Sequence, residues 1–64
     1  MNTVFIFWLV DNDTRLQICE KLGLSQQLTV NGKTVVPISK LTMPVYDELV
    51  ALSVKDKIRL TLEP

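Results

Sequence analysis

The feature that most constrains the fold is a run of seven apolar residues near the N-terminus, from Val4 to Val10. The run contains two phenylalanines and a tryptophan, and it ends at the polar cluster Asp11-Asn12-Asp13. A continuous apolar segment of this length and composition is typical of a β-strand that is covered on both faces. It is much shorter than the roughly 20 residues that cross a bilayer, and no basic residue precedes it as in a signal peptide. We therefore expect it to form the central strand of a sheet.

The segment after this run has the spacing of an amphipathic helix. The cluster Asp11-Asn12-Asp13 offers side-chain oxygens that can cap a helix beginning at about Thr14. Gly23 stands where a left-handed residue commonly ends a helix, and Leu24 after it can fold back onto the last turn. The apolar stripe of this helix consists of Leu16, Cys19 and Leu22.

A hairpin is predicted next, because Asn31-Gly32 lies between two apolar runs in residues 28–36. A two-residue turn would pair Val30 with Lys33. A three-residue turn with Gly32 in a bulge sorts polar and apolar residues better, and we prefer it. Pro37 cannot donate to a strand ladder, so regular pairing is expected to weaken there. In the preferred register, one face carries Leu28, Thr34, Val36 and Ile38.

A second helix and a last strand complete the chain. The helix is capped by Thr42 or Met43, with Pro44 in its first turn. Residues 57–62 alternate between polar and apolar types, as in a half-exposed strand at the edge of a sheet. The inward residues of the helix are Val45, Leu49 and Leu52, those of the strand are Ile58, Leu60 and Leu62, and the strand's outward residues are Lys57, Arg59 and Thr61.

The resulting order, β-α-β-β-α-β, predicts an α+β fold in one domain that spans residues 1–64. It is the order of the ferredoxin-like two-layer sandwich, in which two helices cover one face of an antiparallel sheet and the first and third strands are central. Pro37 is unexpected in a central strand. The alternative is a β-α-β-β sheet with one main helix, the second helix being reduced to a single turn.

The composition argues against an enzyme. The chain has no histidine, one cysteine and a net charge of zero, which removes the usual zinc frameworks and the Ser-His and Cys-His pairs within one chain. Cys19 is interpreted as a buried helix residue, and Asp11 and Asp13 as capping residues and not as cation ligands. We therefore predict no catalytic residue, no cofactor, no metal and no membrane association.

The helices of a two-layer fold leave one face of the sheet open, and the first strand is apolar on both sides. Large apolar residues therefore lie on that open face whichever way the strand is turned, and they indicate a protein interface. The predicted function is regulatory protein binding, most simply as a homodimer that stacks two sheets. The interface candidates are Phe5, Phe7, Trp8, Leu9 and Val35.

Binding of single-stranded nucleic acid is the alternative function. Sheets of this topology can stack bases on aromatic residues of their strands, beside cations that contact phosphates. The candidate cations are Lys33, Lys57 and Arg59. The zero net charge and the lack of a second aromatic strand make this function the weaker prediction.

The single cysteine favours a reducing compartment, so a cytoplasmic location is expected. A chain of this size is typical of accessory proteins of bacteria and their viruses. The residues identify neither a partner nor a pathway.

Overall fold

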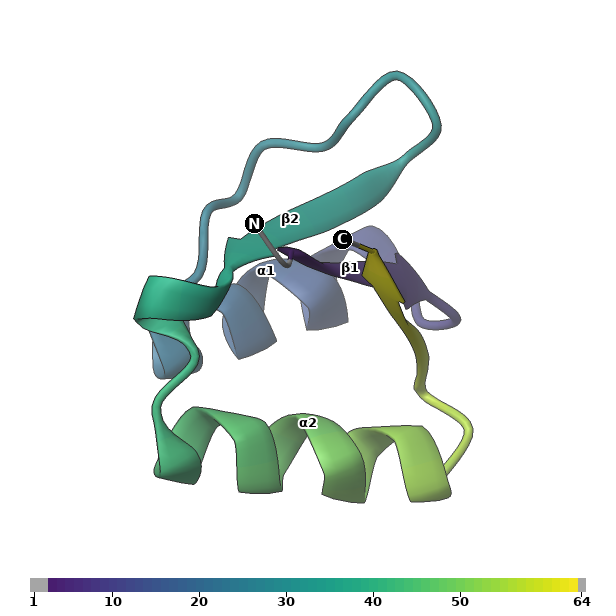
Figure 1. Ribbon diagram of the computed structural model, residues 1–64. Helices are drawn as coiled ribbons and strands as arrows, with labels where there is room; N and C mark the ends of the chain where they lie inside the picture. The colour runs from purple at the N-terminus through teal and green to yellow at the C-terminus, as the bar shows by residue number, and fades with distance from the viewer. Residues whose placement is uncertain (1–2, 64) are drawn as a thin grey trace.

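The computed structural model describes residues 3–63. These residues form the elements β1 (Thr3–Trp8), α1 (Asn12–Leu22), β2 (Lys33–Pro37), the short 3₁₀ turn η1 (Ile38–Lys40), α2 (Met43–Val54) and β3 (Ile58–Glu63). The strands form one antiparallel sheet in the order β2-β1-β3, and α1 and α2 lie on the same side of it (Figure 1). The predicted α+β class is confirmed, with the apolar N-terminal strand at the centre.

The strand register separates the sheet into an inner face, which is turned toward the helices, and an outer face. Val4 is paired with Val36 and Leu62, and Ile6 is paired with Thr34 and Leu60. Directly opposed residues point to the same side of an antiparallel sheet, so all of these side chains share the inner face. The core forms between this face and α2, where Ile6 and Leu49 are completely buried.

The helix ends follow the local signals. The Asp11 carboxylate accepts a hydrogen bond from the Thr14 backbone N–H at 2.9 Å and caps α1. Gly23, with φ of 69°, ends α1, and the Leu24 N–H returns to the Cys19 carbonyl at 2.8 Å. This is the Schellman geometry expected from the sequence. Helix α2 is preceded by Thr42 as N-cap, also as predicted.

The predicted hairpin forms only at its turn. The Thr29 N–H donates to the Lys33 carbonyl at 2.8 Å, the Gly32 N–H donates to the Thr29 carbonyl at 2.9 Å, and Gly32 has a φ of 77°. This is the preferred three-residue turn with glycine in a left-handed position. Residues 24–29, however, contain no strand, so the edge strand that a ferredoxin-like sheet places beside β2 is missing from the described residues.

Arg15 provides a physical reason for this difference. Its guanidinium is buried against the loop, and Nη1 donates to the Gln26 carbonyl at 2.8 Å while Nε and Nη2 donate to Asn12 Oδ1 at 3.1 and 2.8 Å. The backbone of Gln26 is therefore bound to α1 and not to β2. Arg15 lies outside the apolar stripe predicted for this helix, and the sequence contained no signal for its contact with the loop.

The observed sheet thus agrees with the strand content of the β-α-β-β alternative, although α2, with 12 residues, is longer than that alternative assumed. It also explains Pro37. Because β2 is an edge strand in the described sheet, its last residue can be a proline without the loss of an internal ladder hydrogen bond.

Candidate functional site: the outer face of the sheet

The outer face carries a group of apolar side chains on and beside β1. Phe5 lies between Val35 of β2 and Thr61 of β3, and Phe7 lies between Lys33 and Arg59 in the next row. The Leu9 N–H donates to the Lys57 carbonyl at 2.9 Å, which continues the register by one pair beyond β1. Alternation along the strand therefore places Leu9 on the same side as Phe5 and Phe7.

These side chains are accessible because α1 and α2 are both on the opposite side of the sheet (Figure 1). Phe7 is 42% exposed, Leu9 41% and Val35 38%, while Phe5 between them is half-buried. A contiguous apolar surface of this kind is more informative than an isolated exposed leucine, since it is the pattern found at interaction sites.

The loop before β2 adds an apolar residue that was not among the predicted interface candidates. Leu28 is exposed, and together with Val35, Ser25, Gln27 and Thr29 it lines a shallow depression beside β2. The preferred hairpin register grouped Leu28 with Thr34 instead, but Leu28 is not part of a strand and lies beside Val35. We call the group formed by Phe5, Phe7, Leu9, Leu28 and Val35 the outer patch.

The outer patch has a cationic rim. The Lys33 Nζ lies 6.0 Å from the centre of the Phe5 ring, within the range of a cation–π contact. Arg59 is opposite Phe7 on the β3 side, and Lys57 is opposite Leu9. The structure therefore brings together the three cations that the sequence named for the alternative, nucleic-acid function.

Trp8 is the one interface candidate that does not belong to this surface. It is paired with Ile58 on the inner face, and its Nε1–H donates to Thr34 Oγ1 at 2.7 Å. The sequence did not determine which way β1 is turned, and the structure does: Val4, Ile6 and Trp8 point inward, and the phenylalanines point outward.

The side chains considered for catalysis or metal binding lie elsewhere. Cys19 is completely buried in α1. Burial raises the pKa of the Cys19 thiol, and the neighbouring Arg15 opposes the shift only in part, so the thiolate needed for a nucleophile is disfavoured. Within residues 3–63, no group of three or more histidine, cysteine or acidic side chains is placed to hold a metal ion.

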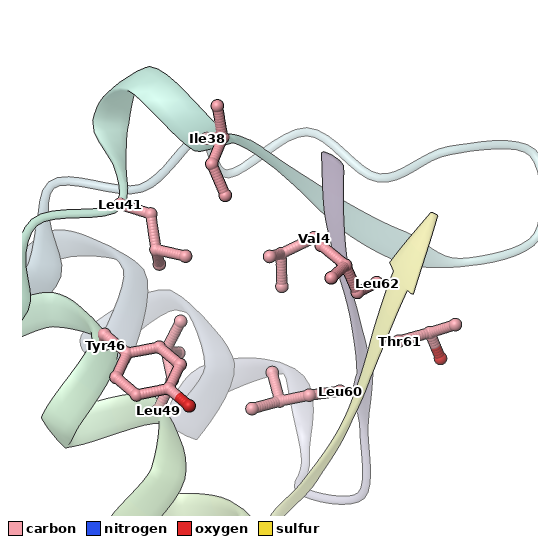
Figure 2. A pocket seen from close by; sticks show the side chains of 8 residues that line it. All are labelled: Val4, Ile38, Leu41, Tyr46, Leu49, Leu60, Thr61 and Leu62. Carbon is pink, nitrogen blue, oxygen red and sulfur yellow. The ribbon is translucent and has the colours of Figure 1, made fainter. Parts of the chain in front are cut away.

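A groove lies on the inner side of the sheet, between α2 and the strands β1 and β3. Its volume is about 320 Å³. Figure 2 shows Leu41, Tyr46 and Leu49 on one side of this groove and Val4, Leu60 and Leu62 on the other, with Ile38 between them at one end. The side chains that point into the groove are apolar apart from the hydroxyl group of Tyr46, and the side chain of Thr61 points away from it (Figure 2), so the groove suits an apolar side chain and not a charged substrate.

None of the helices in residues 3–63 has both the length and the apolar character that a membrane crossing requires. Comparisons with protein-family models, with curated proteins and with solved structures found no match.

Proposed function

We propose that this chain is a non-enzymatic protein-binding module that acts through the outer patch, in its simplest form as a homodimer that stacks two outer faces. The observation that carries the proposal is the contiguity of Phe5, Phe7, Leu9 and Val35 on the face that α1 and α2 leave open. A regulatory or inhibitory role fits a small protein that acts by binding.

The size of the chain supports the same proposal. A chain of this length buries only about 60% of the surface that its unfolded form exposes, so its own core contributes little stability. Contact with a partner removes further apolar surface from water, at roughly 25 cal/mol per Å² before the entropic cost of association. We also propose a reducing, cytoplasmic location, because Cys19 is a free thiol.

The test is a comparison of three charge substitutions by sedimentation equilibrium and thermal unfolding. Phe7→Lys should lower the molar mass and leave a folded protein. Trp8→Lys should unfold it, because Trp8 packs against the core. Val54→Lys is the matched control, since Val54 is an exposed apolar residue at the end of α2 and away from the outer patch.

A wild-type protein that is monomeric at high micromolar concentration would contradict self-association through this face. An oligomer whose mass is the same with Phe7→Lys as with Val54→Lys would contradict it equally.

The second candidate function is binding of single-stranded nucleic acid, and the position of Lys33 and Arg59 on either side of Phe7 favours it. Aromatic side chains beside cations can stack bases and contact phosphates. A fluorescently labelled oligonucleotide of mixed sequence tests this function by anisotropy at low and high salt. Binding that weakens with salt and with the variant Lys33→Gln/Arg59→Gln would support it, and constant anisotropy at low salt would exclude it.

A further inference from the structure

We propose that β3 is a separate self-association surface, along which a second copy of this chain pairs antiparallel to join the two sheets in the order β2-β1-β3-β3-β1-β2. This interface uses the edge of the sheet and not its face, so it goes beyond the outer-patch function and does not depend on it.

The direction of the main-chain N–H and C=O groups of β3 shows which of them can bond to a second strand. Leu9 and Lys57 form a hydrogen-bonded pair, and such pairs alternate with non-bonded pairs along an antiparallel ladder. Arg59, Thr61 and Glu63 therefore bond to β1. The N–H and C=O groups of Ile58, Leu60 and Leu62 point to the other side, away from β1, where the described sheet has no further strand.

The edge at β2 is less suitable for pairing. By the same alternation its outward groups belong to Lys33, Val35 and Pro37. The Lys33 carbonyl already accepts from Thr29, and proline has no N–H. Edges blocked in this way resist pairing with another chain, whereas a regular strand with free groups is a template for it.

The sequence of β3 is complementary to itself. When two copies pair about a two-fold axis at Thr61, Leu60 of each copy is opposite Leu62 of the other, and the free main-chain groups of these residues face one another. On the outer face, Arg59 of each copy is opposite Glu63 of the other. Each dimer then contains two cross-strand pairs of opposite charge, and opposite charges in this position stabilise strand pairing.

The inner face adds an apolar reason for the pairing. Leu62 is 61% exposed although alternation turns it toward the helices. It stands at the rim of the inner groove next to Val4, on the same side of β3 as Leu60 (Figure 2). In the paired arrangement, Leu62 of the second copy lies beside Leu60 at this rim, so that both leucines lose exposed apolar surface.

Charge reversal tests this pairing, because a two-fold axis makes each single substitution act twice. Glu63→Arg places two arginines opposite each other at both ends, and Arg59→Glu does the same with two carboxylates. Each is expected to raise the dissociation constant of the edge dimer by about tenfold. The double variant Arg59→Glu/Glu63→Arg restores both pairs and should restore the dimer. If Arg59→Glu acted only by disturbing the outer patch, the added Glu63→Arg would not restore the dimer.

The measurement is sedimentation equilibrium on the wild type and in the Phe7→Lys background, which separates the two surfaces. If both operate, the wild type contains four copies, Phe7→Lys two, and Phe7→Lys/Glu63→Arg one. A wild-type dimer that Phe7→Lys dissociates but Glu63→Arg does not would overturn the edge proposal and leave the proposed function intact. The reverse result would overturn the proposed function alone.

Cross-linking gives a second readout that does not depend on the strength of the charge pairs. Two Thr61 residues face each other at the axis as a non-bonded pair, with Cα atoms about 4.5 Å apart, a separation that a disulfide can span. In the Phe7→Lys background, which removes the stacked-face dimer, Thr61→Cys should therefore still form a covalent dimer on mild oxidation, while Ser53→Cys on α2 should not. Equal cross-linking of the two variants would contradict the pairing.

Discussion

The indole N–H of Trp8 donates a hydrogen bond to the hydroxyl of Thr34 at 2.7 Å, across the β1–β2 pair and on the inner face of the sheet. Thr34 is completely buried, so its hydroxyl depends on a protein partner. The bond holds the largest side chain of β1 toward the helices. Strand alternation then turns Phe5 and Phe7 outward, and the position of the outer patch is linked to this contact.

A double-mutant cycle should detect the bond between these two residues. Thr34→Val keeps the shape of the side chain and removes the acceptor, and Trp8→Phe removes the donor together with part of the ring. We expect the free energies of unfolding to show a coupling of about 1 kcal/mol, as for a partly buried neutral hydrogen bond. Urea denaturation of the four proteins measures it, and strictly additive effects would show that the bond contributes nothing to stability.

The turn before β2 should be sensitive to the backbone conformation of Gly32. Its φ is 77°, and apart from Gly32 and its two chain neighbours no residue has an atom within 4 Å of the position that a β-carbon would take. Gly32→Ala should therefore destabilise the protein by about 1 kcal/mol through backbone strain alone, without a steric clash. Urea denaturation measures the change, and Asn31→Ala serves as a control with a smaller effect. Equal stability of Gly32→Ala and the wild type would contradict the left-handed turn.

Replacing Asp56, just after the end of α2, by glycine should stabilise the protein, whereas Gly32→Ala should destabilise it. This residue has φ of 58°, and beyond it the Lys57 N–H is bonded to the Leu52 carbonyl at 3.0 Å. Since glycine adopts a positive φ more readily than aspartate, Asp56→Gly should raise the melting temperature. A lower melting temperature in this variant would show that the side chain of Asp56 matters more than its backbone.

Cys19 should react slowly in the folded protein. It is completely buried and its pKa is raised by that burial, so thiol reagents need an opening of the structure to reach it. We expect labelling at pH 8 to be at least about tenfold slower than in the denatured chain. Because the folded protein favours the protonated thiol, this contribution to stability is present below pH 9.0, the ordinary pKa of the group, and is lost as pH rises through the folded value. Fast labelling of the native protein would contradict the helix-core role.

Asp11 should make stability depend on acidic pH. The hydrogen bond from Thr14 lowers the pKa of the Asp11 carboxyl below its ordinary value of 3.8. A lowered pKa in the folded state means that the charged cap stabilises the protein above pH 3.8 and that this stabilisation is lost as pH falls through the folded value. The melting temperature of the wild type, compared with that of Asp11→Asn, should show it. Asparagine also caps helices but carries no charge, so the difference between the two proteins should change as the medium is acidified through that range. A difference in melting temperature that stays constant with pH would show that the charge of Asp11 does not stabilise the protein.

The sequence by itself determined the features that depend on near neighbours. Asp11 and Gly23 mark the two ends of α1, because a cap and a left-handed residue act on the backbone beside them. The alternation of β3 and the glycine of the turn at Gly32 were likewise predictable, and so was the presence of large apolar residues on an open sheet face.

Only the tertiary structure decided which side of β1 became that face. Both alternating sets of side chains in Val4–Val10 are apolar, so the sequence pattern does not show which set points inward. The inward side is the one on which Val4 and Ile6 are buried in the core and Trp8 donates to Thr34, 26 positions along the chain. The same holds for the missing edge strand: the apolar run that begins at Leu28 predicts a strand, but Arg15 binds the Gln26 carbonyl across the loop. Contacts between residues distant in the chain compete with local preferences and outweigh them where those preferences are balanced.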